Sequence, residues 1–453
     1  MDTEAAGPSA IRISISVRAS PIALILAFGL LVRLGAAFLP GFPIDLGTFR
    51  GWSMQLADQG PWNFYTPDPF PDWAPGYLYV LWFLGGLDSV FGFGGHVYWY
   101  LLKLPSIAAD LASAFLLYRI LEWQKPAVRS AAAALYLLNP VVLLVGPVWG
   151  QVDSLLAFFL LFTVYYLARG RTLSAAVVYT IGFLTKPQAV AALPIFVFWG
   201  LRQEIHRILP TLSASGDLLA RGGEFSRNLA GRIWPAAAAA LAAAFLMVFA
   251  FFPSNPFEIV DQLADSQKLY PFSSFYAFNF WEMFGRFKPD DTTFIGLTHR
   301  WWGFLLFGAA SLIIIWTFRD AKGPGLLALA TALSVLAFFL FVTRMHERYL
   351  FPSLLLLVAA GAALNARSIW AVLGVLTVVQ FFNVYYAYIN FTDSSHGIVE
   401  TDNYLTVGWL WEWIDDQVFL ISLITFLTFP ILLAAGFLLA MRERAAEAEP
   451  ADG

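Results

Sequence analysis

The sequence contains no cysteine, so disulfide bonds and thiol chemistry play no part in its fold or its activity. Charged residues are scarce as well. They make up only 13% of the 453 residues, whereas a soluble domain carries roughly 25%. The net charge of −4 is small, and no concentrated basic patch suggests a nucleic-acid partner. Water alone is therefore not the solvent of this chain.

Apolar residues make up 59% of the chain and give it a mean hydropathy of +0.67. Many runs approach the roughly 20 residues that cross a bilayer as an α-helix. Because lipid cannot satisfy backbone polar groups, we expect an all-α, polytopic membrane protein, and the short alternating segments of a membrane β-barrel are missing. The apolar runs are 21–39, 75–92, 97–121, 129–146, 152–169, 172–185, 187–201, 233–252, 301–318, 323–342, 349–364, 369–389 and 418–441.

Lys and Arg concentrate in certain loops, among them 119–129, 169–171 and 202–232. The positive-inside rule places these loops and both termini in the cytoplasm. The alternation works only if 75–92 lies along the outer interface, because a crossing there would turn 119–129 outward. Its glycines, Asp88 and its Tyr and Trp residues suit an interface. We therefore expect about twelve crossings and one interfacial helix in the cytoplasmic membrane of a prokaryote.

The predicted organisation places the polar and aromatic residues in the outer loops, so the site should face outward. No convincing internal repeat is visible, which weakens any interpretation as an inverted-repeat transporter. The basic segment 202–232 is expected to be a flexible linker. The predicted parts are a cytoplasmic tail (1–20), a transmembrane module (21–252) with the first outer loop (40–96), an aromatic outer loop (253–300), a second transmembrane module (301–441) and a cytoplasmic tail (442–453).

Three aspartates stand close to the predicted outer ends of spans: Asp45, Asp72 and Asp153. Each can be interpreted simply as the N-cap of the helix that follows it. Charged groups beside lipid cost on the order of several kcal/mol unless they are paired or functional, so each is also a candidate for chemistry. Lys186 interrupts an apolar stretch, and Pro187 breaks the helix there. Its expected outward position opposes the usual distribution of basic residues.

The turn "RMHERYLFP", residues 344–352, has two arginines on the side that normally carries few. Arg344 and Arg348 are four residues apart, the spacing of neighbours on one helix face, and they flank His346, one of only five histidines. A lipid phosphate is the natural partner for guanidinium groups at headgroup depth. The alternatives without a ligand are that the two arginines pair with Glu347 or only anchor the turn at the lipid surface.

Acidic residues in an aromatic outer loop beside cations suggest a reaction with a lipid-phosphate leaving group. A carboxylate can take a proton from an acceptor hydroxyl while cations stabilise the departing phosphate. The faces of Trp52 and Trp73 suit sugar rings, although such residues also form ordinary interface belts. We add Gln151 and Asp153 to these two tryptophans as candidate substrate-binding residues.

Several segments together resemble the GT-C superfamily of integral-membrane glycosyltransferases, which take sugars from polyprenyl-phosphate donors. They are "PIDLGTFRGW", "DWAPGYLYVLW", "KLPSIAADLASAFLLYRIL", "LLNPVVLLVGPVWGQVDSLLAFFLL", "GFLTKPQAVAALPIF" and "RMHERYLFPSLL". "LLNPVVLLVGPVWGQVDSLLAFFLL" and "RMHERYLFPSLL" look most like the dolichyl-phosphate-glucose and mannose transferases and their bacterial relatives. The resemblance spans roughly residues 20 to 360, and its order of motifs is more specific than any one of them.

The resemblance implies a GT-C-like helical bundle and an inverting enzyme that uses no nucleotide donor. It places the catalytic base at Asp45, a second acidic residue at Asp72 and the donor-phosphate site at His346 and its neighbours. With Arg344, Arg348 and Lys186 these complete the predicted catalytic and phosphate-binding set. The implied partners are a polyprenyl-phosphate-linked sugar and a lipid-linked glycan, glycolipid or protein acceptor. No cofactor is expected, and a divalent metal is not favoured because the first outer loop lacks a D-x-D triplet.

The rival hypothesis is a transporter or flippase of polyprenyl-linked lipids that uses the same cations to hold phosphate. A transporter should carry its polar residues along a path near the bilayer midplane. The candidates here gather at the outer rim instead, beside large loops that offer a surface for an acceptor. The sequence therefore favours the enzyme.

Overall fold

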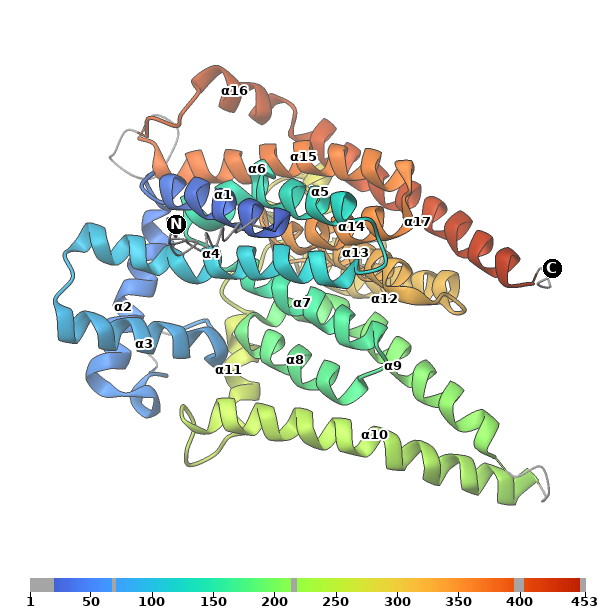
Figure 1. The fold of residues 1–453 in the computed structure, drawn as a ribbon. Helices are drawn as coiled ribbons and strands as arrows, with labels where there is room; N and C mark the ends of the chain where they lie inside the picture. Colours follow the sequence, from blue (N-terminus) through green and yellow to red (C-terminus); the bar gives the residue numbers. More distant parts are fainter. Residues whose placement is uncertain (1–19, 67–70, 213–217, 395–402, 449–453) are drawn as a thin grey trace, which may run out of the picture.

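The structure is a computed structural model that describes residues 20–66, 71–212, 218–394 and 403–448. Most of these residues lie in α-helices, many of them side by side in one bundle, which confirms the predicted all-α class (Figure 1). The first half contains α1 (Pro21–Ala36), α2 (Pro43–Gln59), η1 (Pro61–Asn63), α3 (Pro75–Phe91), α4 (Gly95–Ile120), α5 (Pro126–Leu137), α6 (Pro140–Leu143), η2 (Leu144–Trp149), α7 (Asp153–Ala168), α8 (Thr172–Thr185), η3 (Pro187–Ala192), α9 (Leu193–Ile208), η4 (Leu209–Thr211) and α10 (Leu218–Phe249). The second half contains α11 (Glu258–Ser266), β1 (Ser274–Phe275), η5 (Trp281–Phe284), β2 (Thr293–Phe294), β3 (Leu297–Thr298), α12 (His299–Phe318), α13 (Gly323–Phe341), β4 (Met345–His346), α14 (Phe351–Leu364), α15 (Arg367–Thr392), α16 (Gly408–Asp416) and α17 (Val418–Ala448).

Proline determines where several helices begin. Pro43, Pro75, Pro126 and Pro140 each occupy the first position of a helix, where their fixed φ fits and the missing N–H costs nothing. Side-chain caps are used elsewhere; for example, Thr298 accepts a hydrogen bond from the backbone N–H of Trp301 at the start of α12. The apolar residues that follow these starts then bury the helices against one another.

Six helices within the described residues are long and apolar enough to cross a membrane, and a bent pair makes a seventh candidate. Four shorter apolar helices accompany them: α1, α7, α8 and α14. The chain is thus an integral membrane protein, whereas the count of about twelve crossings stays a prediction. The 17-residue helix α3 is not among the candidate spans. The predicted division into two transmembrane modules also remains untested.

One predicted span is broken in the structure. The run 129–146 was expected to form a single helix, but α5 ends at Leu137 and the pair α5 and α6–η2 bends by 48°. Asn139 starts the second piece, because its side chain accepts a hydrogen bond from the N–H of Val141 at 2.9 Å. A π-helical turn with Pro147 inside it completes the break. This irregular backbone delivers Trp149 and Gln151 to the candidate site.

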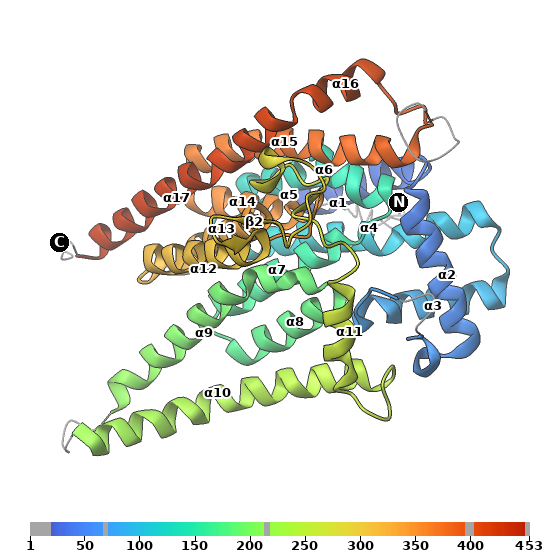
Figure 2. The same ribbon diagram turned by 180° about the vertical axis from the view of Figure 1, so that it is seen from behind.

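The core of the bundle lies around α13 and α14. In α13, 89% of the residues in the apolar window are buried, whereas in α10 the fraction is 6%. α10 therefore lies at the edge of the bundle, where Figures 1 and 2 both show it beside α8. The segment 202–232 was predicted to be a flexible linker, and this prediction is wrong for its described ends, because α9 continues to Ile208 and α10 begins at Leu218.

The two ends of the bundle differ in composition. The connections α7–α8 and α12–α13, with their arginines, and the adjoining ends of α9 and α10 lie together at what we call the basic end (Figure 1). α2, α3, α11 and α16 lie at the opposite end, which we call the site end. There the turn after α13 pairs with the aromatic loop: β1 and β4 run parallel, with Ser274 opposite Met345 and Phe275 opposite His346. β2 and β3 form a separate antiparallel pair in the same loop.

Candidate active site

Asp45 lies in the first turn of α2 with its carboxylate held from one side. Its Oδ2 atom accepts hydrogen bonds from Trp149 Nε1 at 2.7 Å and from Gln151 Nε2 at 2.6 Å. The N-cap of α2 is Phe42, and no side chain caps that helix, so the capping interpretation of Asp45 is wrong. Two N–H donors fix the orientation of the carboxylate. They occupy only one of its two oxygens.

The segment that carries Trp149 and Gln151 is fastened directly to the start of α2. The backbone N–H of Phe42 donates to the carbonyl of Trp149 at 2.9 Å, and the two rings stack at 4.4 Å. Gly150 between the two donors has φ +92°, and a Cβ there would collide with Leu46. Only glycine allows this close approach, so the local sequence "WGQ" positions both donors against Asp45.

Asp72 lies just before α3 and close enough to Asp45 to sense its charge. Burial raises the pKa of Asp72; the charge of Asp45 raises it too, while a backbone hydrogen bond and Arg348 oppose the shift. The N-cap of α3 is Ala74 and has no side-chain cap, so Asp72 does not cap that helix either. The indole of Trp73 donates to the carbonyl of Thr185 at 3.2 Å, which ties this loop to the end of α8.

Asp153 and Lys186 form a buried ion pair. Lys186 Nζ lies 2.7 Å from Asp153 Oδ1, and the two side chains are 2% and 0% exposed. Lys186 occupies the break between α8 and η3, as its proline neighbour predicted. Rings of Trp73 and Tyr349 lie 5.7 and 5.8 Å from its ammonium group. The charge of Lys186 is thus largely balanced by Asp153, which the sequence did not indicate.

Arg348 reaches the same cluster from the turn after β4. Its Nη1 atom lies 2.6 Å from Glu347 Oε1, and its Nε atom lies 3.7 Å from Asp153 Oδ2. Within the described residues that Nε and that Oδ2 are buried without a hydrogen-bond partner. Unsatisfied buried groups of opposite charge are costly, and they are typical of sites that await a ligand. Arg348 also lies over the ring of Trp149 at 5.8 Å.

Arg344 does not join Arg348, contrary to the helical spacing expected for the turn. The backbone at Arg344 has φ +64° and leads into strand β4, so the two arginines do not share a helix face. Arg344 Nε donates to Asp290 Oδ2 at 2.7 Å, and its Nη1 donates to the carbonyl of Gln267. Its backbone N–H donates to the carbonyl of Phe272 at 2.8 Å. Arg344 therefore fastens the aromatic loop to the turn.

His346 is enclosed by aromatic rings. Tyr270, Phe275 and Tyr349 each place a ring centroid 5.0 to 5.2 Å from its imidazole. Burial lowers the pKa of His346 well below its ordinary value of 6.5, and the charges of Arg348 and Lys186 lower it further. The ring is neutral near pH 7, so it can offer hydrogen bonds to a phosphate but not a positive charge.

The other two predicted substrate-binding residues serve structural roles in this conformation. Trp52 is buried in the core between α2 and α3, against Phe49 and Phe64. Gln151 is fully buried and serves as a donor to Asp45, while its carbonyl accepts from Ser106. Neither side chain presents a surface to a sugar here.

Some residues of the site could not be singled out from the sequence. Trp149 had no distinguishing signal beyond its place in "VWGQVD". Tyr270 lies in the aromatic loop. Its pKa is raised mainly by burial and further by the charges of Asp72 and Asp45, while the charge of Arg348 lowers it. Asp290 became relevant only once its pairing with Arg344 was visible.

The assembled cluster contains four carboxylates and two cations. The carboxylates are Asp45, Asp72, Asp153 and Glu347, and the cations are Lys186 and Arg348. Within the described part of the chain no three metal-ligating side chains gather as a metal site would require. Metal independence remains a prediction.

No family model matches the chain, and no curated protein is significantly similar to it. Among solved structures it is similar to the crystal structure of ArnT from Cupriavidus metallidurans bound to undecaprenyl phosphate. The sequence identity is 16%, the alignment covers 94% of this chain and 79% of that chain, and the TM-score is 0.45. A similarity this low transfers no residue roles to this chain.

Proposed function

We propose that the protein is an inverting glycosyltransferase that moves a hexose or pentose from a polyprenyl-phosphate-linked sugar to an acceptor hydroxyl. The observation that carries this proposal is Asp45 Oδ2, held by Trp149 and Gln151 beside two buried cations. A carboxylate fixed at one oxygen has the other free to take a proton. Cations nearby suit a leaving group that gains negative charge.

The proposed reaction is a single displacement at the anomeric carbon. The acceptor hydroxyl gives its proton to Asp45 while its oxygen forms the new bond to the anomeric carbon. The bond between that carbon and the phosphate oxygen breaks, and its electron pair leaves with polyprenyl phosphate. Arg348, which has an unsatisfied Nε, donates to the departing phosphate.

The Asp153–Lys186 pair has a supporting role in this scheme. Because Asp153 balances Lys186 at 2.7 Å, the lysine contributes less net charge than the sequence suggested. Asp153 Oδ2 also lies 3.7 Å from Arg348 Nε. Asp153 therefore holds the guanidinium group of Arg348 in place when no phosphate is bound. The proposed location is the outer face of the cytoplasmic membrane, because the opposite end of the bundle carries the basic loops.

Turnover tests this function directly. Purified protein in lipid nanodiscs is given a panel of polyprenyl-phosphate hexoses and pentoses, and released polyprenyl phosphate is measured with and without candidate acceptors. The proposal expects release from at least one donor, with inversion at the anomeric carbon of the product. Movement of intact donor across sealed vesicles without any bond cleavage would favour the flippase instead.

A further inference from the structure

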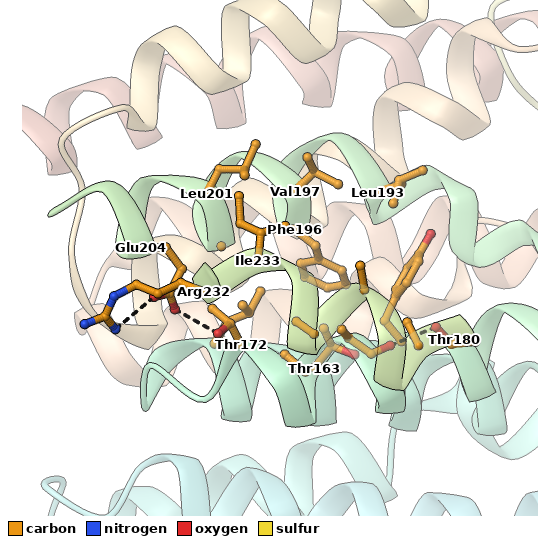
Figure 3. Close-up of a pocket in the computed structure, with 18 residues that line it drawn as sticks. Thr163, Thr172, Thr180, Leu193, Phe196, Val197, Leu201, Glu204, Arg232 and Ile233 are labelled. Atoms are coloured by element: carbon orange, nitrogen blue, oxygen red, sulfur yellow. Dashed lines mark hydrogen bonds and ion pairs between the residues drawn. The ribbon is translucent and has the colours of Figure 1, made fainter. Parts of the chain in front are cut away.

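An apolar groove of ≈ 290 Å³ lies between α8, α9 and α10, and none of its lining residues belongs to the charged site. Figure 3 shows its lining, with Glu204 and Arg232 at one end and Thr180 at the other. α7 forms its floor through Thr163 and Leu167. Because Thr172 starts α8 and Glu204 lies near the end of α9, the charged end of the groove faces the basic end.

The polar side chains that line the groove are already satisfied. Thr163 donates to the carbonyl of Phe159 at 2.8 Å, and Thr180 donates to that of Ala176 at 2.9 Å. Tyr179 donates to the carbonyl of Ala189 at 3.2 Å. The rest of the lining, apart from the charged end, is aliphatic or aromatic. An occupant of the groove would therefore meet hydrocarbon surface, which selects a hydrocarbon chain.

The groove exists because α10 presents small residues to its neighbours. Ala236, Ala237 and Ala240 line it and cannot fill the space that larger side chains would occupy. Only 6% of the apolar window of α10 is buried in the protein, so bilayer lipid surrounds this helix. A space of this size beside lipid, far larger than the roughly 30 Å³ of one water, is open to an acyl chain.

The charged end of the groove is suited to a phosphate. Glu204 is buried, and its Oε1 accepts from Thr172 at 2.8 Å and from Arg207 at 2.5 Å. Arg232 lies 3.5 Å from Glu204 Oε2, and its side chain is 46% exposed. A guanidinium carries five N–H donors, so this one long contact leaves Arg232 with donors for an anion outside the protein.

We propose that this groove binds one anionic glycerophospholipid from the leaflet at the basic end. Its acyl chain lies along the alanine face of α10, and its phosphate accepts from Arg232. The occupant is not the polyprenyl tail of a donor. The phosphate position in the groove lies at the basic end, whereas the reacting phosphate of a donor belongs beside Asp45 at the site end. The exclusion of the donor tail rests on the proposed glycosyltransferase function, whereas the binding of an anionic lipid at Arg232 does not.

Photocrosslinking tests the proposal. Full-length protein in phosphatidylcholine nanodiscs is given phosphatidylglycerol with a diazirine midway along its acyl chain. We expect labelled peptides to map to the groove-lining faces of α8, α9 and α10. Unlabelled phosphatidylglycerol should compete far better than phosphatidylcholine. Equal competition by the two lipids, or labelling spread evenly over the exposed helices, would overturn the proposal.

Two variants and one control sharpen the test. Ala240→Phe fills the groove and should reduce its labelling to the level of exposed helix faces, whereas Ala242→Phe on the exposed face of the same helix should not. Arg232→Gln is at an exposed position and leaves the fold intact; it should weaken competition by phosphatidylglycerol about tenfold, the loss of one charged hydrogen bond. Displacement of the label by polyprenyl phosphate but not by phosphatidylglycerol would assign the groove to the donor tail and refute the proposal.

Discussion

Arg344 and Arg348 occupy one turn but have different electrostatic environments. Arg344 is paired with Asp290 at 2.7 Å and fastens a loop. Arg348 Nε lies 3.7 Å from Asp153 Oδ2, but within the described residues it is buried without a hydrogen-bond partner. Sequence patterns predicted that both arginines bind the donor phosphate. Their different contacts now predict different effects on ligand binding.

We expect Arg348→Ala to weaken binding of polyprenyl phosphate to the purified protein by about tenfold or more, since charged hydrogen bonds contribute about 1.5–3 kcal/mol each. Arg344→Ala should have a much smaller effect, close to that of Arg319→Ala at the basic end. Binding is measured by fluorescence titration, with thermal stability checked for each variant. Equal losses at the three positions would make the turn only a lipid anchor.

His346 should make stability depend on pH. Its pKa is lowered in the folded protein by burial, so the stabilisation is fully present above about pH 6.5 and is lost as pH falls toward the folded-state value. One proton changes the free energy of unfolding by at most about 1.4 kcal/mol per pH unit. Between pH 6.5 and 5 the wild type should therefore lose more stability than His346→Gln. Parallel melting curves for the two proteins across this range would contradict the assignment.

At the scale of helices, the fold depends on a buried polar contact between α1 and α4. Arg33 Nε of α1 lies 3.0 Å from Asp110 Oδ2 of α4, with both side chains fully buried. Tyr136 of α5 donates to the other oxygen of Asp110 at 2.9 Å. This contact could not be predicted from sequence patterns, because the partners are 77 residues apart.

We expect Arg33→Met and Asp110→Leu each to destabilise the protein by about 3–5 kcal/mol, because each leaves a buried charge without its partner. The double variant should recover most of this loss, since it removes both charges together. The melting temperatures of the wild type, the two single variants and the double variant are measured by size-exclusion chromatography after heating. A double variant that is as unstable as the sum of the single variants would show that the pair itself contributes little.

The helix α3 decides the topology of the first spans. Because it should lie along the membrane surface, the connection after α4 should remain in the cytoplasm. The chain has no native cysteine, so Ser89→Cys and Lys125→Cys give single labelling sites, both exposed. An impermeant maleimide added to intact cells should label position 89 and spare position 125. Labelling of position 125 would contradict the predicted topology.

For the molecule as a whole, sequence patterns predicted the helical class and the segments that build the site, for a physical reason. Long apolar runs admit only helices in lipid, and charged residues beside such runs are rare enough to stand out. The pairing of those residues was beyond the sequence. Asp153 with Lys186, Arg344 with Asp290, and the buried position of Trp52 depend on how separate helices pack.

The break after α5 was missed for a related reason. An apolar run containing one asparagine and one proline still fits a span by hydropathy, and only packing shows that the chain bends by 48° there. That bend turns Trp149 and Gln151 toward Asp45, which makes the irregular segment part of the site. Local irregularities of this kind commonly lie at functional sites.

The substitution Asp45→Asn tests the central claim most directly. Asparagine keeps the size of the side chain but cannot accept the proton, so transfer from a polyprenyl-phosphate sugar should fall by roughly two to four orders of magnitude. Binding of polyprenyl phosphate should stay close to that of the wild type, because the proposed phosphate ligand is Arg348 and not Asp45. Asp72→Asn, made in parallel, should reduce transfer less. An Asp45→Asn protein that retains most of its activity while Asp72→Asn loses it would show that the other carboxylate is the base.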